Sequence, residues 1–498
     1  DVAPSRGLGD VYKRQEYEKL QSYSFSNIDH FSVSSLVTRL TSDVTNIQNA
    51  VSTGMRPFGR SPVMLIFATS FAFRINSTLA LVFLVALPTL AVLLILIIIN
   101  VGPLYGRMQS AIDQVNRCIQ ENLTAIRVVK SYVRGDYEVE KFGVVNENLK
   151  SESEKAFGTA VLNMPAMQFV MYGTILGILL IGGRLINEGQ MMIGQLTSFL
   201  SYVLLILNSL MMMSNVFLLM TRSLASAERI MEVIDEKIDI TDENAKDIAV
   251  AKGEIEFDHV WFKYKDAAKE YVLSDVSFHI KPGQTVGIIG QTGSSKTTLV
   301  QLIPRLYDVT KGEVKIDGIN VKEYPVRHLR DAVAMVLQKN TLFSGSLIDN
   351  LRWGNENATL DEIKEACQIA CVDEFVDRLA DGYDTEMGQE GVNVSGGQKQ
   401  RICIARAILK KPKVLILDDS TSAVDTATEA KIRSGLAEKL PDMTRIIIAQ
   451  RISSVRHADQ IIIMDRGHVE AIGTHESLLR DNQIYQEIYA SQKEGADL

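Results

Sequence analysis

The chain has 498 residues, which is enough for two or three domains. Its formal net charge is −8, and its lysines and arginines are dispersed, so no basic stripe favours nucleic acid as a partner. The mean hydropathy is slightly positive although 22% of the residues are charged. This combination indicates that a strongly apolar part and a soluble part share one chain.

The first 15 residues have little pattern, and we expect residues 1–15 to be a non-native junction at the start of a gene fragment. Four apolar stretches follow that are long enough to cross a bilayer, which takes about 20 residues. We predict membrane spans at residues 55–73, 79–101, 161–186 and 191–220. Buried helices of a large soluble protein are the alternative, which the almost uninterrupted second stretch disfavours.

The connections between these stretches differ greatly in length. Spans one and two are joined by Asn76 and Ser77, and spans three and four by residues 187–190, whereas residues 102–160 separate spans two and three. The excess of lysine and arginine in this long segment places it in the cytoplasm. Apolar residues recur there at spacings of three and four, which indicates amphipathic helices. Such helices would extend about 40 Å beyond the membrane and would transmit motion, unless they form a solvated hairpin without a partner.

The apolar runs stop after Ala225, and an acidic stretch follows that we interpret as a linker over residues 226–252. Short β-branched strands then alternate with helical stretches, which is typical of a sheet layered with helices. The strand at residues 286–290 runs into the sequence GQTGSSKTTL. This sequence resembles a phosphate-binding loop, whose N–H groups and following helix hold phosphates. The strict pattern has glycine directly before the lysine, where this chain has Ser295.

A nucleotide site requires a second element, which lies about 120 residues farther along the chain. The sequence VLILDDSTSAVD is an apolar strand that ends in paired acids, and Asp418 fits the magnesium-facing acid. Lys296 would contact the β and γ phosphates, and the Thr297 hydroxyl would hold Mg²⁺. Either element alone can be a buried strand with a polar end, but their order and separation together indicate ATP and Mg²⁺ binding. The expected phosphate-binding residues are Gly290, Gly293, Ser294, Ser295, Lys296, Thr297 and Thr298.

The sequence VSGGQKQRICIARAIL at residues 394–409 resembles the signature of ATP-binding cassette (ABC) proteins. Its glycine-rich helix start is suited to a γ-phosphate, and the resemblance implies that it acts on nucleotide held by a partner subunit. The resemblance also implies that Tyr264 stacks on adenine, that Gln338 senses the γ-phosphate and contacts Mg²⁺, and that Asp425 lies at the dimer interface. The signature residues expected to contact nucleotide are Ser395, Gly396, Gly397 and Gln398.

The membrane half agrees with this family. Residues 34–44 and 120–138 look like the two cytoplasmic coupling segments of exporter-type ABC transporters. The resemblance covers about residues 16–490. It implies an α-helical polytopic membrane domain at 16–225, then the linker, an α/β P-loop nucleotide-binding domain at 253–490, and a tail at 491–498. Exporter halves have six spans, so we expect four of the six in this chain.

Two residues depart from the family pattern at the positions that perform hydrolysis. The residue after Asp418 is normally glutamate, which positions the attacking water; here it is Asp419, shorter by roughly 1.5 Å. A misplacement of about 1 Å can lower the rate on the order of 100-fold. In the segment IIIAQRISSV, the family's histidine is replaced by Gln450, whose amide cannot carry a positive charge. We expect Asp419 and Gln450 to be the catalytic positions of a weakened site.

These features resemble the degenerate subunit of a heterodimeric ABC exporter in the plasma or inner membrane, with its ATP-binding domain in the cytoplasm. The expected partners are a second half-subunit, membrane lipid, and a hydrophobic small molecule, lipid or peptide as substrate. Three alternatives remain: a homodimeric exporter that tolerates both substitutions, an ATP-binding subunit that gates without pumping, and a soluble ABC ATPase of repair or translation. The apolar stretch at residues 79–101 argues against the last of these.

Overall fold

In a computed structural model, residues 3–265, 267–419 and 423–494 are described. The chain divides into two compact units. We call residues 1–16 and 38–232 the helical unit, and residues 17–37 and 233–498 the α/β unit. The short segment Tyr17–Val37 therefore packs with the C-terminal part of the chain, which the sequence analysis did not anticipate.

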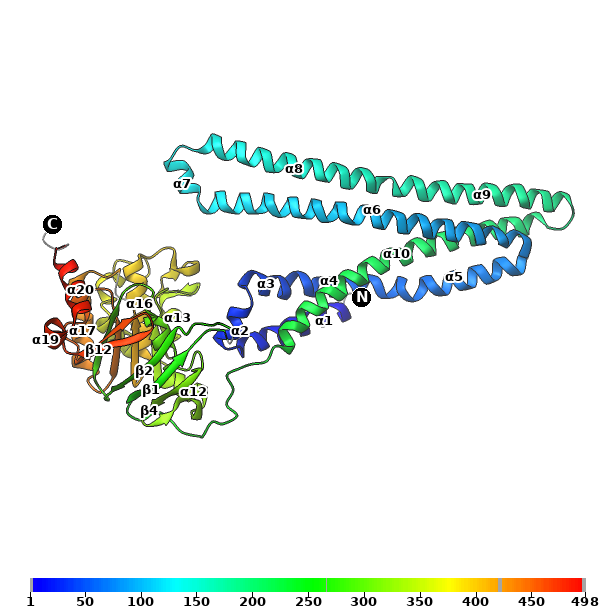
Figure 1. The fold of residues 1–498 in the computed structure, drawn as a ribbon. Helices are drawn as coiled ribbons and strands as arrows, with labels where there is room; N and C mark the ends of the chain where they lie inside the picture. Colours follow the sequence, from blue (N-terminus) through cyan, green and yellow to red (C-terminus); the bar gives the residue numbers. More distant parts are fainter. Residues whose placement is uncertain (1–2, 266, 420–422, 495–498) are drawn as a thin grey trace. The chain divides into compact units, whose positions relative to one another are not determined.

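The boundaries between the units fall inside three helices: α1 (Ala3–Gln21), α3 (Val33–Thr38) and α10 (Ile193–Asp235). The other elements of the helical unit are α4 (Val44–Asn49), α5 (Met55–Ile75), α6 (Ser77–Thr124), α7 (Ile126–Ser131), α8 (Gly135–Val161), α9 (Asn163–Asn187) and the π-helical segments η1 (Arg39–Asp43) and η2 (Ala50–Gly54). Helix α6 lies beside α8 and α9, with α7 at the turn between α6 and α8 (Figure 1). The prediction that the long connection is helical is confirmed.

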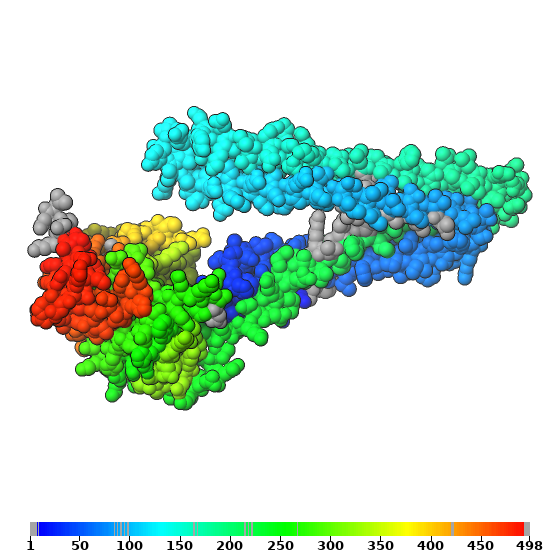
Figure 2. All heavy atoms as spheres, viewed as in Figure 1, coloured from blue at the N-terminus to red at the C-terminus, as the bar shows by residue number. Residues whose placement is uncertain are grey.

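In the space-filling view, the end of α6, α7 and the start of α8 form one continuous surface, in cyan (Figure 2). Asn122 on α6 donates a hydrogen bond to Glu138 on α8 over 3.1 Å, and Lys141 pairs with Glu121 over 3.4 Å. These side-chain bonds fix the two helices side by side along their polar ends.

Two helical windows among the described residues are long and apolar enough to cross a membrane, Gln168–Asn187 and Ile193–Met213. They coincide with the third and fourth predicted spans. The first and second predicted spans lie in α5 and α6, and these two spans stay predictions. A single residue, Asn76, separates α5 from α6, and its side chain accepts a hydrogen bond from the Leu79 N–H to cap α6.

Buried polar groups join the start of the helical unit to α10. Asp43 is 1% exposed, and its carboxylate accepts hydrogen bonds from the Ser226 hydroxyl and the Arg229 guanidinium, each over 2.8 Å. These bonds hold the pKa of Asp43 below its usual value. Arg39 donates to the Arg229 carbonyl over 2.8 Å. The long α10 is thereby bound to η1 near its C-terminal end.

The α/β unit is built around a six-stranded sheet in the order β12-β11-β3-β10-β9-β6. Its strands are β3 (Thr285–Gly290), β6 (Val333–Val336), β9 (Val414–Asp418), β10 (Thr444–Ile448), β11 (Gln460–Asp465) and β12 (His468–Gly473). All neighbours are parallel except β11 and β12. The runs are short, apolar and β-branched, as expected for strands buried on both faces.

A second sheet is antiparallel, in the order β2-β1-β4-β5, and β7 pairs with β8. Their bounds are β1 (Ile255–Phe262), β2 (Leu273–Ile280), β4 (Lys311–Ile316), β5 (Ile319–Asn320), β7 (Gly345–Ser346) and β8 (Glu386–Met387). The helices of the unit are α2 (Phe25–His30), α11 (Lys296–Gln301), α12 (Val326–Ala332), α13 (Leu347–Arg352), α14 (Leu360–Ile369), α15 (Asp373–Val376), α16 (Gly396–Leu409), α17 (Thr426–Lys439), α18 (Ile452–Val455), α19 (His475–Asp481), α20 (Gln483–Glu494) and the 3-10 turns η3 (Val321–Glu323), η4 (Gly382–Asp384) and η5 (Gln389–Gly391).

The segment between α10 and β1 is bound to the α/β unit by hydrogen bonds of its backbone and of the Asp242 side chain. The Lys246 N–H donates to the Glu323 carbonyl over 2.7 Å, and the Val326 N–H donates to Asp242 over 2.8 Å. Arg305, which is 5% exposed, donates to the Thr241 carbonyl over 3.3 Å. The predicted linker is therefore attached to the α/β unit along this part of its length.

Candidate functional site

The loop after β3 has the backbone of a phosphate-binding loop. Gly293 has φ of 86° and Ser295 has φ of 68°, both in the left-handed region. This conformation costs a non-glycine residue about 1 kcal/mol, which explains why the strict pattern has glycine at the Ser295 position. Gly290 has a different reason to be glycine, because an added Cβ would lie 2.1 Å from the Met464 carbonyl oxygen on β11.

Lys296 lies folded over this loop. Its ammonium group donates to the carbonyls of Gly290 and Gln291 over 2.9 and 2.8 Å and lies 3.3 Å from the Ser294 hydroxyl. Burial lowers the pKa of Lys296, and the carboxylates of Asp419 and Asp418 oppose this shift. A partly desolvated cation among backbone groups is well placed to bind phosphate oxygens.

Thr297 and Asp418 form a pair of oxygen ligands suited to Mg²⁺. The Thr297 hydroxyl donates to Asp418 Oδ1 over 3.1 Å. Asp418 is 1% exposed, and among the described residues its Oδ2 has no hydrogen-bond partner. Burial raises the pKa of Asp418. These residues fit Mg²⁺, which takes one or two protein oxygens and completes its shell with phosphates and water.

Asp419 and Gln450 contact each other directly. Gln450 Nε2 donates to Asp419 Oδ2 over 2.8 Å, and Gln338 also hydrogen-bonds the Asp419 carboxylate. Burial raises the pKa of Asp419, whereas the bond from Gln450 lowers it. Asp419 also has φ of 47°, so its backbone is held in the left-handed region at the end of β9.

The sheet topology explains why these side chains meet. Lys296 follows β3, Gln338 follows β6, Asp418 ends β9, and Gln450 follows β10. The four strands are parallel neighbours in the order β3-β10-β9-β6, so their carboxyl ends lie at one edge of the sheet. Parallel α/β sheets bind ligands at this edge. Residues up to 154 positions apart in the sequence thereby form one site.

Tyr264 lies near the loop and is 44% exposed. Its hydroxyl is 2.8 Å from that of Thr298, the third residue of the sequence KTT that opens α11. The exposed part of the ring is accessible to an adenine base. Its other ring contacts are with Phe262 and Tyr307, at centroid distances of 4.9 and 5.2 Å.

Tyr307 and Asp29 are contacts that the sequence analysis missed. The Tyr307 hydroxyl donates to Asp29 Oδ2 over 2.7 Å, and its ring meets that of Phe25 edge-on at 6.0 Å. Helix α2 therefore contacts the region of the ATP site. It lies shortly before the predicted coupling segment at 34–44. That segment forms most of α3, all of η1 and the first residue of α4. The second predicted segment, 120–138, forms the end of α6, α7 and the start of α8. Tyr307 follows an apolar run and belongs to none of the motifs recognised in the sequence. Its position after α11 was the only feature that could have indicated a place near the ATP site.

The signature residues open helix α16. The Ser395 hydroxyl accepts from the Gln398 N–H, and the Gln398 side chain accepts from the Ser395 N–H, which makes a capping box. Ser395 and Gly396 are exposed. A Cβ on Gly397 would lie 2.7 Å from the Ala423 carbonyl oxygen, so close backbone packing requires glycine there. The helix start, with Ser395 and Gly396, thus lies at an exposed surface.

Asp425 caps the next helix, α17. Its carboxylate accepts from the Thr428 N–H over 2.9 Å, and this bond lowers the pKa of Asp425. The structure therefore assigns Asp425 a local role as a helix cap. Its predicted role at a dimer interface stays a prediction.

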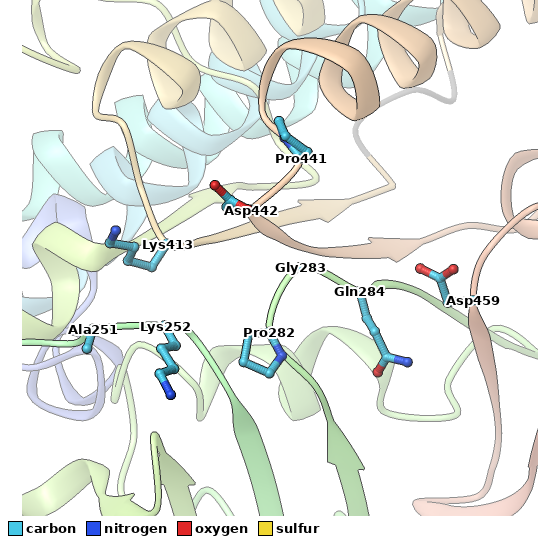
Figure 3. A pocket seen from close by; sticks show the side chains of 9 residues that line it. All are labelled: Ala251, Lys252, Pro282, Gly283, Gln284, Lys413, Pro441, Asp442 and Asp459. Carbon is cyan, nitrogen blue, oxygen red and sulfur yellow. The ribbon is translucent and has the colours of Figure 1, made fainter.

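One hollow in the described α/β unit lies away from these residues. It has a volume of about 580 Å³. Figure 3 shows its lining residues. Gln284, Lys413 and Asp442 come before β3, β9 and β10, so the hollow is at the amino ends of these strands, whereas the phosphate loop follows the carboxyl end of β3. This hollow is therefore separate from the residues of the predicted ATP site.

Comparison with known proteins establishes the family. Residues 13–210 match the ABC transporter transmembrane region, and residues 273–422 match the ABC transporter family. The chain is 40% identical over 483 residues to the uncharacterized ABC transporter ATP-binding protein YfiB of Bacillus subtilis (strain 168), covering 97% of this chain and 84% of that protein. The chain belongs to the ABC transporter family.

Other similar proteins extend the comparison. This ABC transporter is 32% identical over 486 residues to the ATP-dependent lipid A-core flippase of Desulfotalea psychrophila, covering 97% of this chain and 84% of that protein. It is 33% identical over 501 residues to the putative multidrug export ATP-binding/permease protein YgaD of Bacillus subtilis, covering 98% of this chain and 84% of that protein. A solved structure of a bacterial Atm1-family ABC exporter with ATP bound matches with a TM-score of 0.85 at 25% identity, covering 98% of this chain and 86% of that one.

The comparisons confirm the predicted fold class, a helical transmembrane exporter domain followed by an ABC nucleotide-binding domain. This ABC transporter is an ATPase of the exporter type. Membership places it in a membrane with its ATP-binding domain in the cytoplasm.

Proposed function

We propose that this chain is one subunit of a heterodimeric ABC exporter whose own ATP site binds nucleotide and hydrolyses it slowly. The observation that carries the proposal is the pair formed by Asp419 and Gln450, joined over 2.8 Å. The aspartate is short by one methylene for positioning water, and the amide that holds it cannot become cationic. The two residues that depart from the family pattern are joined by one hydrogen bond. The neighbouring Lys296, Thr297 and Asp418 match that pattern.

In this site, ATP and Mg²⁺ bind without rapid turnover. Tyr264 stacks on the adenine, Lys296 holds the β and γ phosphates, and Thr297 and Asp418 hold Mg²⁺ with a contribution from Gln338. The contacts described for these residues support the assignment: the Thr297 hydroxyl donates to Asp418 Oδ1, and the buried Oδ2 of the same carboxylate has no hydrogen-bond partner among the described residues. The bound Mg²⁺ would neutralise charge that develops on the phosphates.

The signature of this chain completes the hydrolytic site on the partner. Ser395 and Gly396 are exposed at the start of α16, and their helix N-terminus attracts the γ-phosphate of nucleotide held by the other subunit. Asp425 at the cap of α17 lines the same interface. Hydrolysis at the partner's site resets the cycle.

The transported substrate is hydrophobic or amphipathic, and a drug-like molecule, lipid or peptide fits this class. A similar protein is named a lipid A-core flippase and another a putative multidrug exporter. The chain crosses the membrane several times over residues 16–225, and residues 253–490 form the ATP-binding domain. Residues 34–44 and 120–138, together with α2 before the first of them, couple the two, because closure of the ATP-binding domains must move the membrane helices.

The test is the ATPase activity of this subunit alone and of the subunit purified with the half-transporter encoded beside it. We expect activity only in the pair. In the pair, replacing the partner's catalytic glutamate by glutamine should abolish turnover, whereas Asp419→Asn in this chain should reduce it less than about twofold. Full activity of this subunit as a homodimer would contradict the heterodimer proposal, and the two substitutions would then be tolerated ones.

A further inference from the structure

An aromatic cluster connects the ATP site to helix α2. Tyr307 is at its centre, with ring centroids 5.2 Å from Tyr264, 5.7 Å from Phe262 and 6.0 Å from Phe25. The contacts with Tyr264 and Phe25 are edge-on, which is a favoured arrangement for aromatic rings. Tyr264 is the residue placed to stack on adenine, and Phe25 begins α2. One side chain therefore touches both the base-binding residue and α2.

Each end of this cluster is fixed by a hydroxyl group. The Tyr264 hydroxyl is 2.8 Å from the Thr298 hydroxyl on α11, and the Tyr307 hydroxyl donates to Asp29 Oδ2 over 2.7 Å. Burial and the bond to Asp29 both raise the pKa of Tyr307, so its hydroxyl keeps its proton and remains a donor. Asp29 is the fifth residue of the six-residue helix α2.

Helix α2 and the two residues before it are in turn bound to the end of α10 and to the residues that follow it. The Tyr23 hydroxyl donates to the Val233 carbonyl over 2.5 Å, and Asn27 Nδ2 donates to the Lys237 carbonyl over 2.8 Å. The hydroxyls of Ser24 and Ser26 donate to the Asp239 carboxylate. A displacement of α2 must therefore act on the residues directly after α10 and, through Tyr23, on the C-terminal end of α10 itself.

From these contacts we infer that Tyr307 is a positioning residue that transmits occupancy of the adenine site to α2 within the same chain. The inference rests on the proposed function, since it takes Tyr264 as the adenine-stacking residue. A base stacked on the exposed part of Tyr264 fixes the orientation of that ring. Tyr307 meets the ring edge-on, so its own orientation becomes fixed, and its bond to Asp29 orders α2.

A transmitting role and a purely structural role of Tyr307 differ in whether the stability of α2 depends on bound nucleotide. A structural residue would stabilise α2 equally with and without nucleotide, whereas a transmitting residue makes the stability of α2 depend on the base. The dependence on the base separates it from signals carried by the phosphates alone. This distinction is the basis of the experiment.

The test is hydrogen–deuterium exchange of the complete transporter in lipid nanodiscs, with MgATP or with magnesium tripolyphosphate, which lacks the base and ribose. In the wild type, we expect both to slow exchange in the phosphate loop, residues 290–298. Only MgATP should slow exchange in residues 24–30. In Tyr307→Phe, which keeps the ring and removes the hydroxyl, MgATP should still protect the loop. The ATP-dependent slowing in residues 24–30 should fall about fivefold, the equivalent of one hydrogen bond.

Two further variants make the outcome specific. Asp29→Asn should reproduce the loss in residues 24–30, and the double variant should lose no more than either single variant, because both act on one bond. Tyr271→Phe is the matched control: it removes a hydroxyl from an aromatic residue whose ring meets Trp261 edge-on instead, and it should behave as the wild type.

The results separate failure of the inference from failure of the proposed function. Equal slowing of residues 24–30 by ATP in wild type and Tyr307→Phe, with the loop protected in both, would overturn the role of Tyr307. Slowing of residues 24–30 by tripolyphosphate would overturn the role of the base. Absence of loop protection by MgATP in the wild type would instead refute ATP binding at this site.

Discussion

Gln450 donates a hydrogen bond to Asp419 over 2.8 Å, so the two residues that depart from the family pattern are direct partners. A bond of this kind occupies the carboxylate oxygen that would otherwise orient water. Because the amide is neutral, it holds Asp419 without adding positive charge near the γ-phosphate. The two departures therefore form a single functional feature.

Restoring both residues should restore hydrolysis. We expect Asp419→Glu with Gln450→His to raise the turnover of this site on the order of 100-fold, since reach and charge are both corrected. Each single change should give much less, because the residues are in contact and act together. The measurement is ATP hydrolysis by the pair with the partner's phosphate-loop lysine replaced by alanine. Additive effects of the two single changes would argue against a functional unit.

Ser295→Gly should stabilise the α/β unit. Serine has φ of 68° there, and glycine removes the strain of a left-handed conformation, worth about 1 kcal/mol. Both tryptophans, Trp261 and Trp353, lie in this unit, so intrinsic fluorescence of the chain reports its thermal unfolding. We expect the melting temperature to rise by roughly 2–4 °C. Ser294→Gly is the matched control; it removes a buried hydroxyl near Lys296 and should lower the melting temperature.

Asp418→Asn should stabilise the nucleotide-free unit while abolishing the response to MgATP. Burial raises the pKa of Asp418 in the folded state, so its ionisation costs stability as pH rises through that raised value. The variant should melt higher than the wild type at pH 7.5, and the difference should shrink as pH falls toward 3.8. MgATP at about 100 times its Kd should stabilise the wild type by about 2.7 kcal/mol. The same addition should have little effect on the variant, and a wild-type response there would exclude Asp418 as a magnesium ligand.

The two signature glycines should respond differently to alanine. A Cβ on Gly397 would lie 2.7 Å from the Ala423 carbonyl oxygen, whereas one on Gly396 would lie 3.6 Å from the Ala423 methyl group. We expect Gly397→Ala to destabilise the unit by about 2 kcal/mol, and Gly396→Ala to leave its thermal stability unchanged or slightly increased. The measurement is tryptophan fluorescence during heating. Equal melting temperatures for both variants would mean that the loop carrying Ala423 moves freely to make room.

Much of the site could be read from the sequence because its motifs carry local chemistry. The glycine and lysine positions of the loop before Lys296 have a fixed spacing, and so do the paired acids that begin at Asp418. The strand before each motif is an uninterrupted apolar run. Parallel topology then brings the carboxyl ends together, so the meeting of Lys296, Asp418 and Gln450 follows from the strand order. The bond between Gln450 and Asp419 required coordinates, since nothing in the sequence says which partner a polar side chain selects.

The contact made by α2 could not be predicted in the same way. Asp29 and Tyr307 are 278 positions apart, and neither belongs to a motif with chemical requirements. Residues 34–44 were predicted to be the first coupling segment, but the residues that contact Tyr307 lie before it, in α2. In the sequence, Ser295 stood out only because the strict phosphate-loop pattern has glycine there. The structure shows that its backbone is left-handed, with φ of 68°, which is unfavourable for a non-glycine residue.

The packing of α2 and the linker against the α/β unit has a practical consequence for isolating the ATP-binding half. A fragment that starts at residue 253 would leave the ring of Tyr307 without Phe25 and Asp29, and would expose apolar surface that favours aggregation. A soluble version should combine two pieces of chain, Tyr17–Val37 and residues 233–494. Leu36 and Val233 belong to one buried cluster, so a short flexible peptide can join the pieces in place of the helical unit.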